Sequence, residues 1–246
     1  MTQRDHQFAK LKRPPAYKVV ADELIKAIAK KTLRPGDLLP IEGELAEQFG
    51  VNRSTVREGI RYLEQSGLVT RKGKRLMVSR PSYQVLADQF CPALIVHDVS
   101  FLELWTVTLE LEPLAARLAS EKATPEILAT LEANLNDTKA ALARGDDLVQ
   151  LDIEFHELLA EAADNKALSI SRSALARLFY PAYRTGMFPE TSGERLVMAH
   201  EIILNAIREH DTERATEWMY KHMVDFKRGY ELAGLDVLSP LPWREE

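Results

Sequence analysis

Four side chains in the second half of the sequence have the types and spacing of metal ligands. Asp152 and His156, within LVQLDIEFHELL, are four residues apart, so on a helix they lie one turn above each other. Leucines and a phenylalanine share that face, which therefore points inward, where an unpaired carboxylate is strongly unfavourable. His200 and His222 also fall on apolar helical stripes. We expect all four side chains to lie in a core.

The positions of His200 and His222 along the chain indicate that they meet. His200 precedes Asp211 by 11 residues and His222 follows it by 11. If the chain reverses at His210-Asp211, two antiparallel helices carry both imidazoles to the same height. One Asp and three His at one level suit a divalent metal, zinc first, with nickel or manganese also compatible and room for a water or ligand oxygen. Taken singly, each residue also fits a hydrogen-bonded core position.

A different chemistry is indicated by the stretch VNRSTVREGI, residues 51–60. Asn52 is expected to cap a helix through its side-chain oxygen. Arg53 and Arg57 then occupy the first turns, although a helix N-terminus is already positive. This arrangement is favourable mainly when an anion docks on that end of the helix.

The charge distribution agrees with an anionic partner for the first third of the chain. Residues 1–82 hold 17 Lys and Arg against 9 Asp and Glu, whereas residues 83–246 hold 15 against 28. A basic segment joined to an acidic remainder is typical of polyanion binding confined to one domain. The alternative is a solvated basic face with no partner.

The elements that position Arg53 and Arg57 are predicted to form a winged helix-turn-helix. Helices are predicted at 17–31, 41–49 and 53–66, with only Val51-Asn52 between the last two. On the third helix, Ser54, Arg57 and Arg61 fall on a different face from its apolar stripe. Two short strands within LVTRKGKRLMV flank a basic turn at Lys72-Gly73-Lys74.

The rest of the chain reads as an all-helical bundle. About seven helices are predicted, at 84–93, 100–121, 124–143, 147–163, 166–186, 192–209 and 212–233, with the first ending at a Cys91-Pro92 turn. The fold class is therefore mainly α. We divide the chain into a winged helix-turn-helix domain with its N-terminal arm (1–79), a linker (80–83), a helical domain (84–235) and a tail (236–246); the family resemblances given below imply DNA binding for the first domain, and effector binding and dimerisation for the helical one.

Composition places few further limits on the protein. Cys91 is the single cysteine, which excludes an internal disulfide and fits a reducing compartment. The first residues lack the apolar core of a secretion signal, and no apolar run approaches the roughly 18 residues of a membrane span. These features predict a cytoplasmic protein.

The stretch LPIEGELAEQFGVNRSTVREGIRYLEQSGLV resembles the winged helix-turn-helix of GntR-type transcription regulators. The resemblance implies that the third helix enters the major groove of DNA, with Arg53 and Arg57 on bases or phosphates and Ser54 and Thr55 on phosphates. Arg61, Lys72, Gly73 and Lys74 complete the predicted DNA-binding set. The sequence departs from the family pattern at Gly43, where an arginine is usual, and at the wing tip, which has one glycine instead of two.

The Asp and His pattern, with Asn165 between its parts, resembles the FCD effector domain of the FadR subfamily of GntR regulators, over most of residues 95–230. The resemblance implies that the Asp and three His bind a divalent metal. Thr108 stands where many FCD domains carry an arginine for an effector carboxylate. Thr108, Arg177 and Arg184 are therefore candidates for the effector pocket, Arg172 is another source of charge, and Asn165 is expected to be a helix cap.

Together these features predict a homodimeric transcription regulator that binds a pseudo-palindromic DNA operator and is not an enzyme. The expected mode of action is repression that is released when a small organic acid, the effector, binds through its carboxylate next to the divalent metal. Two alternatives remain: a metal-dependent hydrolase, and a regulator that senses the metal itself.

Overall fold

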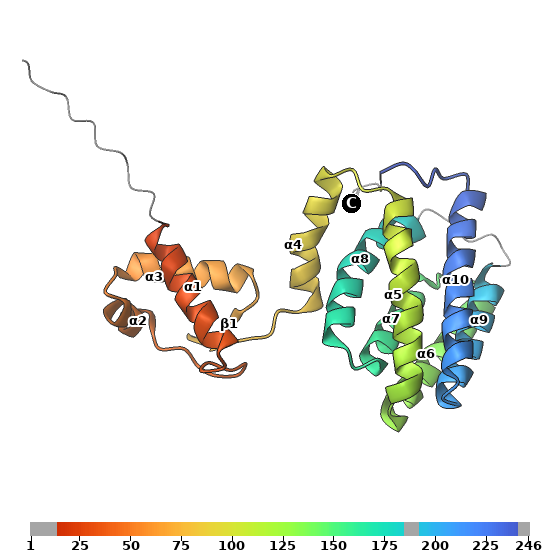
Figure 1. The fold of residues 1–246 in the computed structure, drawn as a ribbon, viewed down its shortest axis with the longest axis horizontal. Coiled ribbons are helices and arrows are strands. Elements are labelled where there is room, and N and C mark those ends of the chain that lie inside the picture. The colour runs from red at the N-terminus through yellow and green to blue at the C-terminus, as the bar shows by residue number, and fades with distance from the viewer. Residues whose placement is uncertain (1–13, 185–191, 241–246) are drawn as a thin grey trace, which may run out of the picture. The chain divides into compact units, whose positions relative to one another are not determined.

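The protein is described by a computed structural model that covers residues 14–184 and 192–240, and the chain divides into two compact units between Val85 and Leu86 (Figure 1). The first unit holds three helices and a hairpin. The second holds seven helices within the described residues. The predicted fold class, a winged helix-turn-helix followed by a helical bundle, is confirmed.

The first unit is built around its third helix. Its elements are α1 (Ala16–Ala29), α2 (Glu42–Phe49), α3 (Arg53–Gln65), β1 (Val69–Lys72) and β2 (Arg75–Val78). Helices α1 and α2 both pack on α3. Val56, Ile60 and Leu63 of α3 are completely buried between them, as the apolar stripe of the sequence predicts.

Helix α3 begins directly after a tight joint. Gly50 ends α2 in the left-handed region, with φ 64°, a conformation that glycine adopts without steric cost. Asn52 has the extended backbone of an N-cap, but its side chain makes no capping hydrogen bond, so the expected side-chain cap is wrong. The exposed Asn52 side chain leaves the first N–H groups of α3 without that intramolecular acceptor.

The wing is a short antiparallel hairpin. Val69 pairs with Val78 and Lys72 with Arg75, so Gly73 and Lys74 form a two-residue turn. Gly73 has φ 63°, which explains the glycine at this position.

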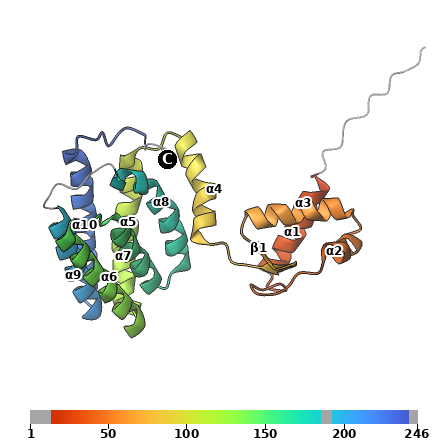
Figure 2. The same cartoon turned by 180° about the vertical axis from the view of Figure 1, so that it is seen from behind.

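The second unit is a bundle of helices (Figure 2). They are α4 (Tyr83–Val96), α5 (Phe101–Lys122), α6 (Pro125–Arg144), α7 (Val149–Ala162), α8 (Lys166–Arg184), α9 (Ser192–Arg208) and α10 (Thr212–Leu232). Helix α5 packs against α7, α8, α9 and α10, while α6 packs against α7 and α9. The central helix α5 therefore borders every helix that supplies a predicted metal ligand.

Local signals account for most helix ends. Ser100 and Glu103 form a capping box at the start of α5, and Thr124 caps α6 just before Pro125. Asp211 caps α10 by accepting a hydrogen bond from the Arg214 N–H. Apart from α4, the predicted ends of these helices lie within two residues of the observed ones, except that the end predicted at residue 186 lies outside the described residues.

The turn predicted at Cys91-Pro92 is wrong, because α4 continues to Val96 with Pro92 inside it. A proline removes one backbone donor and crowds the preceding turn, but it does not forbid the helix from continuing. Beyond Pro92, the His97 N–H still bonds to the Ala93 carbonyl at 3.2 Å.

Among the helices of the described residues, none combines the length and apolar character that crossing a membrane requires.

Candidate metal centre and nucleic-acid interface

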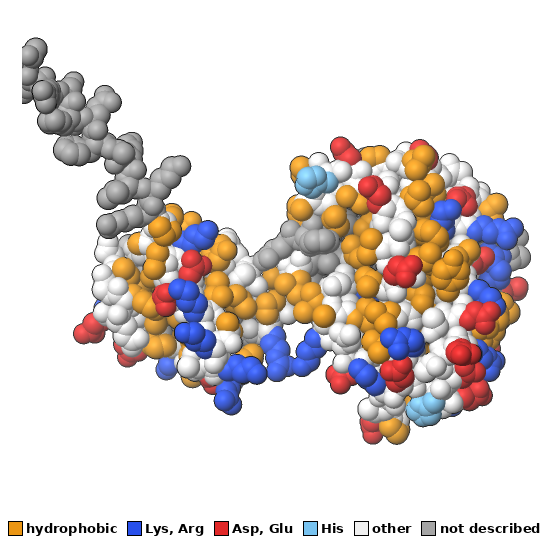
Figure 3. All heavy atoms as spheres, viewed as in Figure 1, with side chains coloured by type: hydrophobic (Ala, Val, Ile, Leu, Met, Phe, Trp, Pro, Cys, Tyr) orange, Lys and Arg blue, Asp and Glu red, His pale blue; other side chains and the backbone are white. Residues whose placement is uncertain are grey.

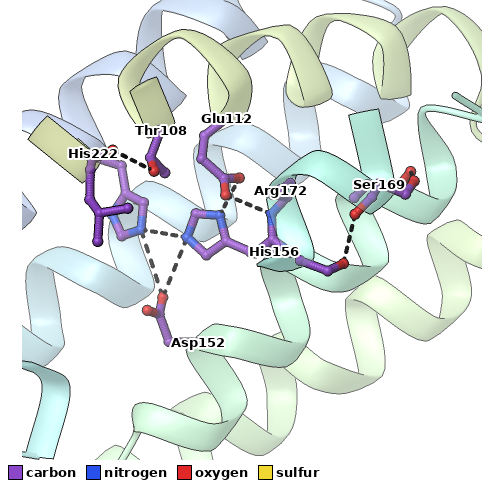
Figure 4. A network of polar contacts seen from close by, with 10 residues as sticks. Thr108, Glu112, Asp152, His156, Ser169, Arg172 and His222 are labelled. Carbon is purple, nitrogen blue, oxygen red and sulfur yellow. Dashed lines mark hydrogen bonds and ion pairs between the residues drawn. The ribbon is translucent and has the colours of Figure 1, made fainter. Parts of the chain in front are cut away.

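The four predicted metal ligands come together in the second unit, and we call them the Asp–His cluster: Asp152, His156, His200 and His222. Asp152 and His156 come from α7, His200 from α9 and His222 from α10. One donor atom from each lies within 4.8 Å of the others. Figure 4 shows Asp152, His156 and His222 pointing toward one another.

The reversal that brings α9 and α10 together occurs at His210-Asp211. His210 has φ 57°, and Asp211 caps the following helix. The equal spacing of His200 and His222 from Asp211 thus places both imidazoles beside Asp152, at 3.1 Å and 3.7 Å from its Oδ1.

The distances within the Asp–His cluster are suited to a shared cation. The His156 and His222 Nε2 atoms are 3.2 Å apart, and His156 Nε2 lies 3.8 Å from Asp152 Oδ1. Two ligand atoms bound tetrahedrally to one zinc, each at about 2.0–2.1 Å, are about 3.3 Å apart. The observed separations bracket this value, so small side-chain movements would suffice to hold one ion.

Three atoms of the Asp–His cluster lack the hydrogen bonds that buried polar groups normally make: Asp152 Oδ1 and both ring nitrogens of His200. Asp152 Oδ1 and His200 Nε2 are both buried, and neither makes a hydrogen bond of acceptable geometry although they are 3.1 Å apart. Unsatisfied buried groups of this kind are rare in folded proteins and call for an explanation such as an ion. A divalent cation coordinated by Asp152 Oδ1 and His200 Nε2 fits the chemistry of the residues present.

The ionisation states of Asp152 and His200 also suit metal binding. Burial opposes the ionisation of Asp152, but the facing imidazoles of His200 and His222 hold its pKa well below the ordinary value. Burial lowers the pKa of His200 to about 3. An ionised carboxylate and a neutral imidazole are the forms that bind a metal.

Glu112 of α5 contacts the ring nitrogen of His156 that faces away from the other three residues of the Asp–His cluster, and so orients this histidine. Its Oε2 lies 2.8 Å from His156 Nδ1, and its Oε1 accepts a hydrogen bond from Arg172 Nε at 2.6 Å (Figure 4). Burial raises the pKa of Glu112, but Arg172 and His156 outweigh this effect and lower it to about 2. A carboxylate on Nδ1 leaves Nε2 directed at the cluster, the usual arrangement behind a metal-bound histidine.

The Glu112 contact could not be found from the sequence. Glu112 lies 44 residues before His156, and no local pattern links them. Arg172, considered from the sequence as a charge for the effector, is buried against Glu112 instead. Asn165 caps α8, as predicted, by accepting a hydrogen bond from the Leu168 N–H.

A small cavity of about 30 Å³ adjoins the Asp–His cluster. Asp152 and His222 form part of its wall, together with Ser192, Arg195, Asp225 and Phe226. A volume of about 10–15 Å³ is enough for one water molecule. The cavity therefore has room for an additional oxygen ligand beside the cluster.

The three residues predicted for the effector pocket can be placed only in part. Thr108 is buried, and its hydroxyl donates a hydrogen bond to the Leu104 carbonyl of its own helix at 2.9 Å. Figure 4 shows it near the Asp–His cluster. The side chains of Arg177 and Arg184 lie outside the described part of the structure.

The predicted DNA-binding residues of α3 lie on its outer face. Arg53, Ser54, Arg57 and Arg61 are exposed, and Thr55 is half-buried. Arg57 pairs with Glu42 of α2 at 3.0 Å, yet 62% of its side chain remains exposed. The guanidinium is therefore held in place without being buried.

The wing adds exposed cations to the first unit. Lys72, Gly73 and Lys74 are all exposed at its tip, and Arg71 pairs with Glu64 at 2.8 Å. Figure 3 shows Lys and Arg side chains gathered on part of this unit, whereas both signs of charge are mixed on the visible face of the second unit. The first unit thus presents a positive surface suited to a polyanion.

Comparison with known families assigns each unit. Residues 16–76 match the profile described as bacterial regulatory proteins, gntR family, and residues 103–225, half of the chain, match the FCD domain. The metal-ligand candidates on α7, α9 and α10 all lie within the FCD match.

Similar proteins agree with this assignment. The chain is 29% identical over 219 residues to the HTH-type transcriptional repressor NanR of Cronobacter sakazakii, covering 87% of this chain and 84% of that protein. It is 28% identical to the uncharacterized HTH-type transcriptional regulator YdhC of Bacillus subtilis, with coverage of 87% and 90%. The solved structure of Streptococcus agalactiae GntR is 27% identical, with a TM-score of 0.65 over 86% of this chain and 99% of that one.

The matched domains and relatives are those of DNA-binding regulators, which excludes the hydrolase alternative. The chain belongs to the GntR family of bacterial transcription regulators and carries the C-terminal FCD domain, a combination consistent with the FadR subfamily.

Proposed function

We propose that this regulator is a homodimeric repressor that leaves its operator when a small organic acid binds beside a divalent metal in the FCD domain. The observation that carries the proposal is the Asp–His cluster, whose four donor atoms converge next to a cavity. The name of one relative, a transcriptional repressor, supports the direction of regulation.

In this proposal Asp152, His156, His200 and His222 hold the metal, with zinc the first candidate. The metal supplies a positive centre for a carboxylate oxygen, and Glu112 keeps His156 turned toward it. The buried, unsatisfied Asp152 Oδ1 and His200 Nε2 support this assignment.

The DNA contacts are proposed from the exposed face of α3 and the wing. Arg53, Arg57 and Arg61 project cations, and Ser54 and Thr55 offer hydroxyls, from a helix of suitable size for the major groove. Lys72 and Lys74, exposed at the wing tip, would contact phosphates. A two-fold dimer would read two half-sites of a pseudo-palindrome.

The experiment starts with operator selection from random DNA, followed by binding measurements on the selected sequence with metal-loaded and chelator-treated protein. We expect steeply salt-dependent binding. Small carboxylic acids should weaken operator binding only when the protein holds metal. By reciprocity, operator DNA should weaken the binding of the acid by the same factor. Equal responses of loaded and metal-free protein to every acid would contradict a metal-dependent effector site.

A second proposal, direct sensing of the metal, is favoured by the small size of the cavity. In this case the metal alone would change operator affinity, because its binding would fix the positions of α7, α9 and α10, which carry the four ligands. Titration of metal into metal-free protein, without any organic acid, distinguishes the two: a change in operator affinity supports direct sensing.

A further inference from the structure

The start of α2 lies against the arginines of α3. Gly43 is the second residue of α2, and the Arg53 guanidinium covers it. A Cβ atom added at Gly43 would lie 3.1 Å from Arg53 Nη2 and 3.4 Å from Cζ and Nε. The 3.1 Å separation is tighter than an ordinary van der Waals contact, so even a methyl group at position 43 would shift the Arg53 guanidinium by a few tenths of an ångström, and a longer side chain would displace it further.

The backbone of α2 does not require this glycine. Gly43 lies in regular helix, where alanine is the more stable residue because glycine loses more conformational freedom on folding. The helix start is stabilised separately, since the Ile41 N–H bonds to Glu44 Oε2 at 3.1 Å. What Gly43 provides is space for Arg53.

The preceding residue acts on the second arginine. Glu42 Oε2 accepts hydrogen bonds from Arg57 Nε at 3.2 Å and Nη2 at 3.0 Å. Two donors on one oxygen fix the plane of the guanidinium, while its exposure leaves the pair open to competition from DNA. Adjacent residues of α2 therefore control the side-chain positions of two arginines that lie one turn apart on α3.

We infer that Glu42 and Gly43 are specificity-determining positions, which act by placing the guanidinium groups of Arg57 and Arg53 before DNA arrives. The inference rests on the proposed role of α3 in DNA recognition. Because Gly43 has no side chain, the Arg53 guanidinium can pack against α2. Glu42 fixes the orientation of the Arg57 guanidinium through hydrogen bonds and offsets its charge. Both effects favour a base sequence that fits the preset arginines over indiscriminate phosphate binding.

The test is operator selection from a randomised DNA library with the full-length protein and its variants Gly43→Ala, Gly43→Gln and Glu42→Gln. Glu47→Gln is the matched control for the last, because it removes an equal charge from an exposed residue of the same helix. Thermal unfolding of each variant checks the fold, and Gly43→Ala should unfold at an equal or higher temperature.

We expect Gly43→Gln to change the base preferred at one position of each half-site by about tenfold or more, the discrimination typical of a bidentate arginine contact. Gly43→Ala should shift the same position less, since the flexible end of Arg53 need move only a few tenths of an ångström. Glu42→Gln should raise affinity for non-cognate DNA more than for the operator, whereas Glu47→Gln should affect the two equally.

Unchanged base preferences in a folded Gly43→Gln protein, together with equal behaviour of Glu42→Gln and Glu47→Gln, would overturn the inference while leaving DNA binding by α3 intact. If the wild-type protein selects no sequence at all, the proposed function fails first, and the inference falls with it. The two failures are thereby told apart.

Discussion

The two units of this regulator build their candidate sites in opposite ways. In the first unit the proposed DNA contacts of α3 lie within nine residues of one helix, from Arg53 to Arg61, and its arginines are exposed. In the second unit the Asp–His cluster comes from three helices, and its donor atoms lie in or beside the core. Only exposed side chains can contact a DNA duplex, whereas a metal is held best by ligands fixed inside a packed bundle.

This difference affects what each site depends on. One helix orients all the arginines at once, so the first site needs only that α3 be held on its core. The cluster exists only when α7, α9 and α10 pack together, with α5 supplying Glu112 behind His156. The second site should therefore be the more sensitive to single changes in its surroundings.

The largest expected effect is on metal content. The double variant His200→Ala, His222→Ala removes two of four ligands, and we expect it to be purified without metal, whereas wild-type protein should hold about one equivalent per chain. Elemental analysis of protein made without added metal measures this. His97→Ala, at an exposed histidine outside the cluster, is the control. Metal retained by the double variant would mean that the cluster is not the site.

A core substitution tests whether the two units are independent. Ile60 of α3 is completely buried, and Ile60→Ala should lower the free energy of unfolding of the first unit by about 2–5 kcal/mol. Denaturant titration measures this loss of stability. Operator-binding measurements and metal analysis of the same variant should then show weakened DNA binding with unchanged metal content. Loss of metal in this variant would show that the units fold as one.

A change at Glu112, which orients His156, should have an intermediate effect on metal binding. Glu112→Gln keeps the size of the side chain but removes the charge that faces His156 and Arg172. We expect metal affinity to fall by about 10–100-fold, as is typical when a group behind a metal ligand is changed. Competition with a chelator measures the affinity, and Glu110→Gln, an exposed acid of the same helix, should match wild type.

The smallest effect is expected at the surface. Arg57→Ala should weaken operator binding by about 1 kcal/mol, the low end of the range for a base contact, because Arg57 must leave Glu42 to reach DNA. Fluorescence anisotropy at fixed salt concentration measures the change. Arg208→Ala removes an equal charge from the second unit and should leave operator affinity unaltered; matching losses in the two variants would point to a general charge effect.

The sequence predicted most of the fold because the signals that end helices are local. Caps such as Ser100 and Asp211, and the left-handed Gly50 and Gly67, act within a few residues of their position. Pro92 misled the prediction, since a proline weakens a helix without always ending it.

By itself, the sequence determined the exposed face of α3, the wing and the identity of the four cluster residues, because helical periodicity and the symmetric spacing about Asp211 depend only on the chain's own geometry. Only the tertiary structure decided which groups stand behind these residues. Glu112 reaches His156, Arg172 reaches Glu112 and Glu42 reaches Arg57 across 44, 60 and 15 residues. Such contacts follow from how whole helices pack, and no local pattern in the sequence encodes them.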